Sequence, residues 1–234
     1  MAQRRFEVAD KLTAQNYNHE WFAKSALEAD FRLTAEQRQP QTEKYEDVVS
    51  AYCKEVRQLG FRLLEAISES LSLEKDYIGK VMGDQGQHMA VNYYPPCPQP
   101  ELTFGLPSHT DPNTITILLQ DGQVAGLQVL KEGKWLAVDP CPNALIVNLG
   151  DQIQAVSNGM YRSVRHRAVV NSNQERISVA AFLCPANDAT IGPAKQLVTG
   201  ESPALCRDFT YDEYYKKFWS RNLDEEHCLE LFKG

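Results

Sequence analysis

The stretch TITILLQDGQVAGLQVLKEGKWLAV, residues 114–138, contains three short apolar runs separated by turn signals. Asp121-Gly122 and Glu132-Gly133 are typical of tight turns, and the runs beside them have the length of β-strands. The strands predicted in this way along the chain cover residues 88–94, 114–119, 126–131, 134–138, 144–148, 152–156, 162–170 and 176–183. A series of short strands with such turns predicts a mainly β protein, the double-stranded β-helix or jelly roll of cupins.

Helices are predicted on both sides of this β region. Apolar residues recur at three- and four-residue steps from Tyr45 to Leu73, which predicts one long helix, and a second helix is expected at 73–82. Thr210-Tyr211-Asp212-Glu213 fits a capping box at the start of another helix. The predicted organisation is a polar, loosely structured arm at 1–43 and one domain at 44–234, with helices at 44–83, a jelly-roll core at 86–195 and a C-terminal helix at 208–232.

Composition and charge argue against several classes of protein. The net charge is −7, whereas nucleic acids and anionic membranes favour a basic surface. No apolar run reaches the ~18–20 residues of a membrane-spanning helix, and the first residues lack a secretory signal pattern. The six cysteines show no CxxC pairing and are expected to be reduced. We expect a cytoplasmic protein that binds neither nucleic acid nor membrane, and we expect it to be a monomer.

The residues that carry chemistry begin with His109-Thr110-Asp111, just before a predicted strand. Residues i and i+2 of an extended segment point to the same side, so His109 and Asp111 can reach one ion. His166 can complete a facial set of two imidazoles and one carboxylate, which holds non-haem Fe(II) and leaves the opposite face open for co-substrate and dioxygen. Singly, these residues have simpler explanations: Asp111 can belong to a turn, and His166 can be a histidine packed in a barrel strand.

A second pair, Arg176 and Ser178, shares one face of the strand predicted at 176–183. An arginine that points into an apolar barrel is costly unless a carboxylate meets it, and its planar guanidinium binds carboxylates through two parallel hydrogen bonds. A keto acid with two carboxylates could chelate iron at one end and meet this pair at the other. The simpler explanation of Arg176 is a surface arginine on an edge strand. A zinc hydrolase could use the same two histidines and aspartate, but it would leave Arg176 and Ser178 without a role.

Five motifs occur in order along the chain: NYYPPCP at 92–98, GLPSHTD at 105–111, GLQV at 126–129, NLGD at 148–151 and RIS at 176–178. Together they closely resemble the motifs of the plant Fe(II)/2-oxoglutarate-dependent dioxygenases, and the resemblance runs from about residue 44 to the end. The segment YYKKFWSR at 214–221 is similar to the corresponding segment of one group in particular, the flavanone 3-hydroxylase-like and salicylate-hydroxylating (downy-mildew-resistance-type) oxygenases.

The resemblance implies an oxidoreductase that uses dioxygen and converts 2-oxoglutarate to succinate and carbon dioxide. The implied substrate is a small aromatic or phenolic metabolite, such as salicylate or a flavonoid, which is hydroxylated or desaturated, and ascorbate is the expected reductant. The implied catalytic iron ligands are His109, Asp111 and His166. Around 2-oxoglutarate the resemblance places Arg176, Ser178, Tyr94 and Asn92. Phe182 holds the position of an aromatic that faces a planar substrate, although core packing explains it equally well.

The sequence differs from these dioxygenases near its beginning, where their Gly-Phe-Phe-like segment and Asn-His-Gly turn are not found. In the family this region supplies edge strands of the barrel and part of the substrate wall. We therefore expect an uncovered sheet edge and a half-open pocket. The alternative that follows is a truncated relative that still binds iron but acts as a non-catalytic binding module.

Overall fold

The computed structural model describes residues 5–10, 35–120, 122–221 and 227–233. Its strands are β1 (Arg5–Asp10), β2 (Gly86–Tyr94), β3 (Leu106–His109), β4 (Ile115–Gln120), β5 (Leu127–Lys131), β6 (Lys134–Ala137), β7 (Ile146–Leu149), β8 (His166–Ala168), β9 (Arg176–Cys184), β10 (Thr190–Ile191) and β11 (Phe209–Thr210). Its α-helices are α2 (Ala35–Ser70), α3 (Tyr77–Met82), α4 (Asp151–Val156) and α5 (Tyr211–Ser220). Short 3₁₀ helices lie at Pro100–Leu102, Lys195–Leu197 and Cys228–Phe232.

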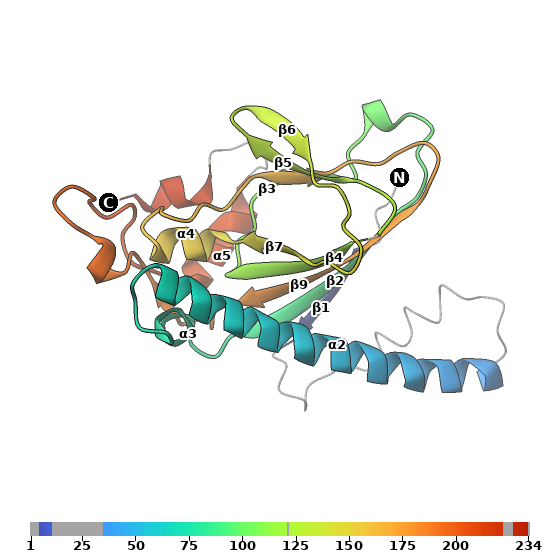
Figure 1. The fold of residues 1–234 in the computed structure, drawn as a ribbon, viewed down its shortest axis with the longest axis horizontal. Helices are drawn as coiled ribbons and strands as arrows, with labels where there is room; N and C mark the ends of the chain where they lie inside the picture. Colours follow the sequence, from blue (N-terminus) through green and yellow to red (C-terminus); the bar gives the residue numbers. More distant parts are fainter. Residues whose placement is uncertain (1–4, 11–34, 121, 222–226, 234) are drawn as a thin grey trace.

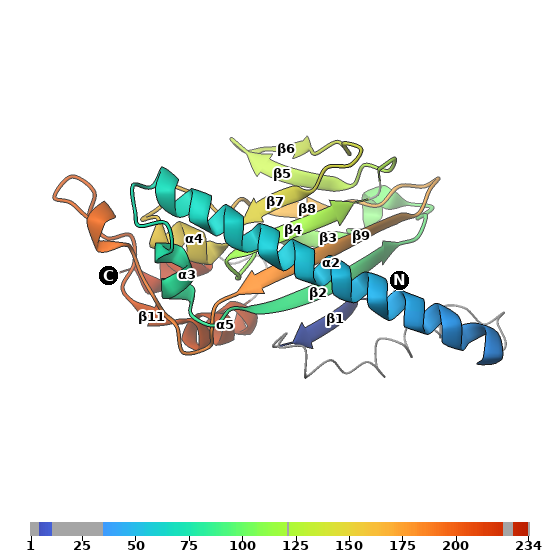
Figure 2. The ribbon, with the colours of Figure 1, turned by 60° about the horizontal axis from the view of Figure 1, so that its bottom comes forward.

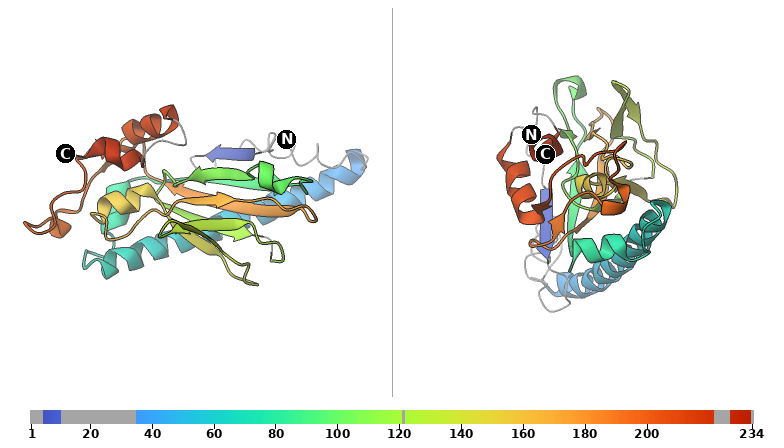
Figure 3. Two further views of the ribbon diagram at one scale, coloured as in Figure 1. Left: turned by 90° about the horizontal axis from the view of Figure 1, so that it is seen from above. Right: turned by 90° about the vertical axis from the view of Figure 1, so that its left-hand side faces the viewer.

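Two antiparallel sheets form the body of the protein and confirm the predicted mainly β, jelly-roll architecture. The larger sheet has the order β1-β2-β9-β4-β7 and the smaller one the order β3-β8-β5-β6. The long helix α2 crosses the outer face of the larger sheet, with the smaller sheet on the opposite side (Figures 1 and 2). Figure 3 shows the same layers from two further directions. The space between the sheets therefore has strands on both sides.

Strand β9 lies in the middle of the larger sheet and gives it two chemically different faces. Alternate residues point to opposite faces of a strand. Leu183 of β9 and Ile117 of β4 are fully buried in the core cluster that includes α2 residues. The intervening residues point toward the smaller sheet, and among them Ser178 is aligned with Asn92 of β2. The period of two thus separates the core face from the face that carries the predicted site.

Helix α2 approaches the larger sheet closely at one glycine. Its residues Val56 and Leu64 are buried, and Gly60 lies between them in the sequence. A Cβ atom on Gly60 would lie 2.4 Å from Cδ1 of Leu183 in β9. Glycine is unfavourable inside a helix by ~1 kcal/mol relative to alanine, so this close packing explains its presence.

One predicted strand, at 152–156, is wrong, because these residues belong to helix α4. The chain leaves the sheet at Gly150, whose N–H donates to the carbonyl oxygen of Thr114 at 2.9 Å, and the N–H of Asp151 donates to the carbonyl oxygen of Asp111 at 2.8 Å. Ile153 and Val156, three positions apart, are then both buried. An apolar run this short fits one turn of a buried helix as well as a strand, so the sequence pattern alone could not separate the two.

Other predicted boundaries are longer or shorter in the structure. The strand predicted at 162–170 is reduced to β8, whose ladder partners in β3 and β5 reach only His166–Ala168. The predicted C-terminal helix at 208–232 is also too long, since α5 ends at Ser220 and a 3₁₀ helix follows at Cys228–Phe232. The predicted capping box is confirmed, because α5 begins at Tyr211 and the Thr210 hydroxyl accepts a hydrogen bond from the Glu213 N–H at 3.2 Å. The helix predicted at 73–82 begins later, at Tyr77.

The beginning of the chain also differs from the prediction. Helix α2 begins at Ala35, inside the predicted arm, and β1 pairs with β2 in the register Arg5↔Asn92 to Asp10↔Gln87. The expectation of an uncovered sheet edge is wrong at β2, because β1 supplies the ladder partner of this strand. The rest of the predicted arm, 1–4 and 11–34, lies outside the described residues. Within the described part of the chain, no helix is both long and apolar enough to span a bilayer.

Candidate metal centre and pocket

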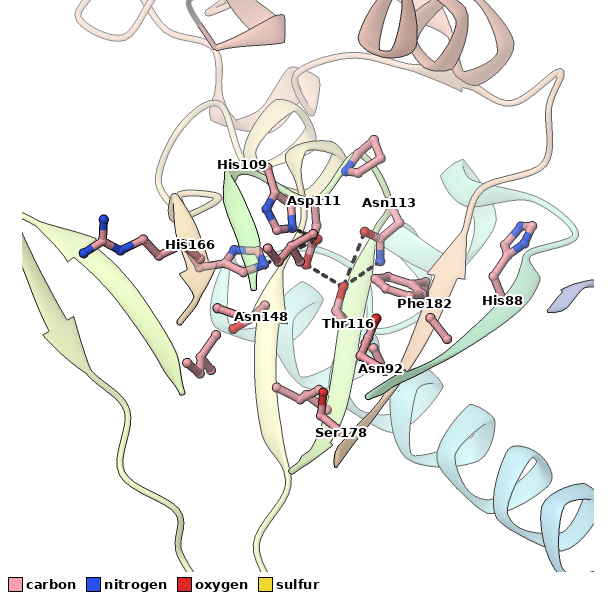
Figure 4. Close-up of a pocket in the computed structure, with 18 of the residues that line it drawn as sticks. His88, Asn92, His109, Asp111, Asn113, Thr116, Asn148, His166, Ser178 and Phe182 are labelled. Atoms are coloured by element: carbon pink, nitrogen blue, oxygen red, sulfur yellow. Dashed lines mark hydrogen bonds and ion pairs between the residues drawn. The ribbon is translucent and has the colours of Figure 1, made fainter. Parts of the chain in front are cut away.

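A cavity of about 240 Å³ lies between the inner faces of the two sheets. Residues of β2, β4 and β9 form one wall, residues of β3, β5 and β8 form another, and α5 contributes aromatic side chains. Most of the lining is apolar. Figure 4 shows His109, Asp111 and His166 close together, with Thr116, Asn92 and Ser178 progressively farther along the cavity.

The three predicted metal ligands are brought together. His109 ends β3, His166 begins β8, and the two residues are direct partners in the ladder between these strands. The Nε2 atoms of His109 and His166 each lie 3.7 Å from Oδ1 of Asp111. One donor atom from each side chain lies within 4.8 Å of the others. A single ion can therefore contact all three residues.

The imidazole rings are oriented for metal binding by backbone carbonyls. Nδ1 of His109 lies 2.8 Å from the carbonyl oxygen of Pro107, and Nδ1 of His166 lies 3.1 Å from that of Val164. A neutral imidazole that donates its Nδ1 proton to a carbonyl has a free lone pair on Nε2. Both Nε2 atoms face the carboxylate. This arrangement is common among metal-binding histidines.

Asp111 is held by a hydroxyl group behind it. Only 3% of Asp111 is exposed, and its Oδ2 accepts a hydrogen bond of 2.7 Å from Oγ1 of Thr116. Thr116 accepts in turn from Nδ2 of Asn113 at 3.1 Å, and Nδ2 of Asn113 also donates to the carbonyl oxygen of Ile115 at 2.8 Å. One carboxylate oxygen is thus used by the scaffold, and the other is directed to the histidines.

Arg176 lies in the interior, with 3% of its surface exposed, so the surface-arginine explanation is wrong. Its Nη2 donates to Oε1 of Gln120 at 3.2 Å, and its guanidinium carbon lies 5.3 Å from the centroid of the Tyr94 ring. Gln120 is uncharged, so this bond orients the guanidinium without neutralising it. A Cβ atom on Gly126 would lie 2.7 Å from Cδ of Arg176, which explains the glycine of the GLQV motif.

The other predicted residues also line the cavity. Ser178 is 3% exposed and Asn92 8%, and they are aligned across β9 and β2, next to the pair Arg176 and Tyr94. Phe182 lies farther along the same face of β9 and contacts both the cavity and the core. The structure therefore brings together all the residues predicted for the metal, for 2-oxoglutarate and for the substrate.

Sequence reasoning missed several polar residues of the lining, among them Thr116 and Asn148, and a whole aromatic wall. Asn148 of β7 lines the cavity, and its NLGD motif could have indicated this position. The aromatic wall from α5 comprises Tyr211, Tyr215, Phe218 and Trp219. No sequence signal distinguishes an aromatic helix face that packs on a barrel from one that lines its opening.

Cys184 also lines the cavity and is chemically quiet. Only 7% of it is exposed, and burial raises the pKa of its thiol from 9.0 to about 12. Burial also raises the pKa of the neighbouring Tyr211 hydroxyl well above its ordinary value. Both groups are therefore neutral near pH 7 and add no charge to the metal centre.

Comparisons with known proteins agree with this geometry. Residues 85–185 match the model of the 2OG-Fe(II) oxygenase superfamily. The chain is 68% identical over 189 residues to flavanone 3-dioxygenase 2 of Oryza sativa subsp. japonica, covering 81% of this chain and 55% of that relative. It is 63% identical over 191 residues to protein DOWNY MILDEW RESISTANCE 6 of Arabidopsis thaliana, covering 80% and 56%. The chain thus spans about half the length of the curated relatives it matches.

Solved structures show the same architecture. The crystal structure of JOX2 in complex with 2OG, Fe and JA superposes with a TM-score of 0.83 at 34% identity, covering 98% of this chain and 64% of that chain. The crystal structure of a dioxygenase for auxin oxidation in rice has a TM-score of 0.74 at 28% identity, covering 98% and 72%.

Proposed function

The chain belongs to the 2OG-Fe(II) oxygenase superfamily, and from this premise we propose that it is an Fe(II)- and 2-oxoglutarate-dependent dioxygenase that oxidises a small aromatic molecule. One observation carries the proposal: a single cavity contains both a His-Asp-His set and the buried guanidinium of Arg176. A zinc hydrolase would use the first feature and leave the second without a role.

His109, Asp111 and His166 would hold the metal through the two Nε2 atoms and Oδ1. When bound, Fe(II) and 2-oxoglutarate supply the oxidising chemistry, in which dioxygen is consumed and 2-oxoglutarate becomes succinate and carbon dioxide. The protein's own contribution begins with orientation. The two carbonyl acceptors fix the imidazole tautomers, and the hydroxyl of Thr116 fixes the carboxylate. The donor set thus exists before any ligand arrives.

Arg176 and Ser178 would bind the distal carboxylate of 2-oxoglutarate. The guanidinium offers two parallel N–H donors, and the serine on the same strand face offers a hydroxyl. Burial strengthens these interactions, because little water competes with a site that is 3% exposed at both residues. Gln120 and the ring of Tyr94 keep the guanidinium at a fixed place relative to the metal ligands.

The proposed substrate is a phenolic compound such as salicylate or a flavonoid. Two observations support an aromatic substrate: the mostly apolar lining, and the rings of Phe182, Phe218 and Trp219 in the wall. A cavity of about 240 Å³ is below the ~300–1,000 Å³ of sites for drug-sized ligands, and 2-oxoglutarate must share it. The volume therefore favours a one-ring substrate over a flavonoid. Flavonoids are still included in the test, because two relatives are named flavanone 3-dioxygenase 2 and oxoglutarate-dependent flavonoid 7-O-demethylase 1.

The proposed setting is the cytoplasm, with ascorbate as the reductant. All six cysteines are free thiols, and Cys141 is the exposed one. Free thiols in this number suit a reducing compartment.

The test is an anaerobic titration of the purified chain with Fe(II) and 2-oxoglutarate, followed by an assay of succinate release with salicylate, flavanones and related phenolics in the presence of ascorbate. We expect a weak visible charge-transfer band, and succinate release stimulated by a phenolic compound. The variant Asp111→Asn is the control and should lose the band. Folded protein without the band would refute the proposal. A band without substrate-stimulated succinate would instead indicate the non-catalytic binding module.

A further inference from the structure

A buried carboxylate outside the metal-binding set connects that set to the C-terminal part of the chain. Asp151 is the first residue of α4 and is 0% exposed. Its Oδ2 accepts hydrogen bonds from the hydroxyl groups of Thr110, at 3.1 Å, and Tyr214, at 2.7 Å. Thr110 lies between the metal-binding residues His109 and Asp111, whereas Tyr214 lies in α5. One oxygen atom therefore joins two segments that are far apart in the sequence.

His227 faces the other oxygen of the same carboxylate. Its Nδ1 accepts a hydrogen bond from the N–H of Leu229 at 3.2 Å, so the proton of the neutral ring is on Nε2. Nε2 lies 3.1 Å from Oδ1 of Asp151. The two hydroxyl hydrogen bonds to Oδ2 offset part of the cost of burying the carboxylate, whereas Oδ1 lies near Nε2 of His227 without a hydrogen bond between them.

A backbone hydrogen bond also connects Asp151 to the triplet His109-Thr110-Asp111. Its N–H donates to the carbonyl oxygen of Asp111 at 2.8 Å. The preceding residue, Gly150, lies against Asn113, because a Cβ atom there would be 1.9 Å from the Asn113 carbonyl oxygen. Tyr214 remains a donor, since burial, and then the negative charge of Asp151, raise the pKa of its hydroxyl well above the ordinary value.

From these contacts we propose that Asp151 is a positioning residue. It joins helix α5 to the triplet His109-Thr110-Asp111, because its carboxylate accepts hydrogen bonds from both Tyr214 and Thr110. The inference rests on the proposed function only where it assigns His109 and Asp111 to a metal. The link itself belongs to the protein and can be measured without metal.

The link gives the aromatic wall a route to the metal centre. Helix α5 lines the cavity with Tyr215, Phe218 and Trp219, and it donates to Asp151 from Tyr214. A substrate that displaces this wall therefore acts on the same carboxylate that holds Thr110. Substrate binding at the aromatic wall and the position of the metal ligands are therefore coupled, so that a change in one alters the other.

The test is a double-mutant cycle with Thr110→Val, Tyr214→Phe and the combined variant. These changes each remove one hydroxyl, whereas Asp151→Ala would leave several buried donors unpaired and disturb folding. Hydrogen–deuterium exchange is measured on the metal-free protein in segments 106–120 and 211–220. Each single variant should speed exchange about tenfold in both segments. The combined variant should exceed either single variant only slightly, because both bonds end on one carboxylate.

The matched control is Tyr161→Phe, which removes a tyrosine hydroxyl 2.8 Å from the hydroxyl of Ser70 and should leave both segments unchanged. Effects confined to the segment that carries the substitution, or effects that multiply in the combined variant, would overturn the inference. Co(II) affinity is the second readout and should fall by a similar factor in both single variants. A wild-type chain that binds no Co(II) or Fe(II) would defeat the proposed function, while the exchange result still decides the link.

Discussion

Replacing Thr116 by valine removes the hydroxyl that holds the proposed iron ligand Asp111 and keeps the shape of the side chain. The hydrogen bond between them is 2.7 Å long, and both residues are 3% exposed. Water cannot easily replace the lost donor. The carboxylate then has to be ordered by the metal itself, which costs binding free energy. We expect metal affinity to fall.

The magnitude follows from the type of bond. Hydrogen bonds to charged groups contribute about 1.5–3 kcal/mol, and loss of a partner behind a metal ligand lowers affinity about 10- to 100-fold. We therefore expect the dissociation constant for Co(II) or Fe(II) to rise about 10- to 100-fold in Thr116→Val. Anaerobic competition titrations followed by visible absorption measure this constant directly.

Two variants on the same stretch of chain make the test specific. Thr116→Ser keeps the hydroxyl and should bind metal within a few-fold of the wild type. Thr114→Val also replaces a fully buried threonine, but the Thr114 hydroxyl has no hydrogen-bond partner among the described residues. It should bind metal normally and be as stable as the wild type, or more so. Wild-type affinity in Thr116→Val, or equal losses in all three variants, would refute the reasoning.

Three further predictions concern the co-substrate, the packing and the pH dependence. Arg176→Lys replaces two parallel donors by a point charge and should raise the KM for 2-oxoglutarate about 10- to 100-fold, with metal affinity unchanged; indifference would favour a hydrolase. Gly60→Ala places a Cβ atom 2.4 Å from Cδ1 of Leu183 and should lower the free energy of unfolding by about 1–3 kcal/mol in urea titrations. Burial raises the pKa of Cys184 from 9.0 to about 12 and that of Cys206 to about 11. Because unfolded thiols ionise first, their contribution to stability is complete below about pH 9 and is lost as the pH rises toward 11 and 12, so the urea midpoint should fall over this range.

Much of the site could be predicted from spacing alone. His109 and Asp111, and Arg176 and Ser178, are pairs two residues apart on extended chain, and such pairs face the same side whatever the rest of the fold. The fold class followed from the series of short apolar runs and the turn signals between them. Local geometry contains this information, so it can be read without knowing how the strands pair.

The tertiary structure decided which distant segments meet. The direct pairing of His109 with His166 depends on the register between β3 and β8, and no property of either segment specifies it. Residues 152–156 form a helix because the chain leaves the sheet just before them, where the N–H groups of Gly150 and Asp151 donate to the carbonyl oxygens of Thr114 and Asp111. Local sequence determined the functional groups that each strand offers. The aromatic wall of α5 and the hydrogen bonds shared by the Asp151 carboxylate depend instead on long-range packing. Packing brings together residues that are far apart in the sequence, and no local pattern in either segment specifies its partner.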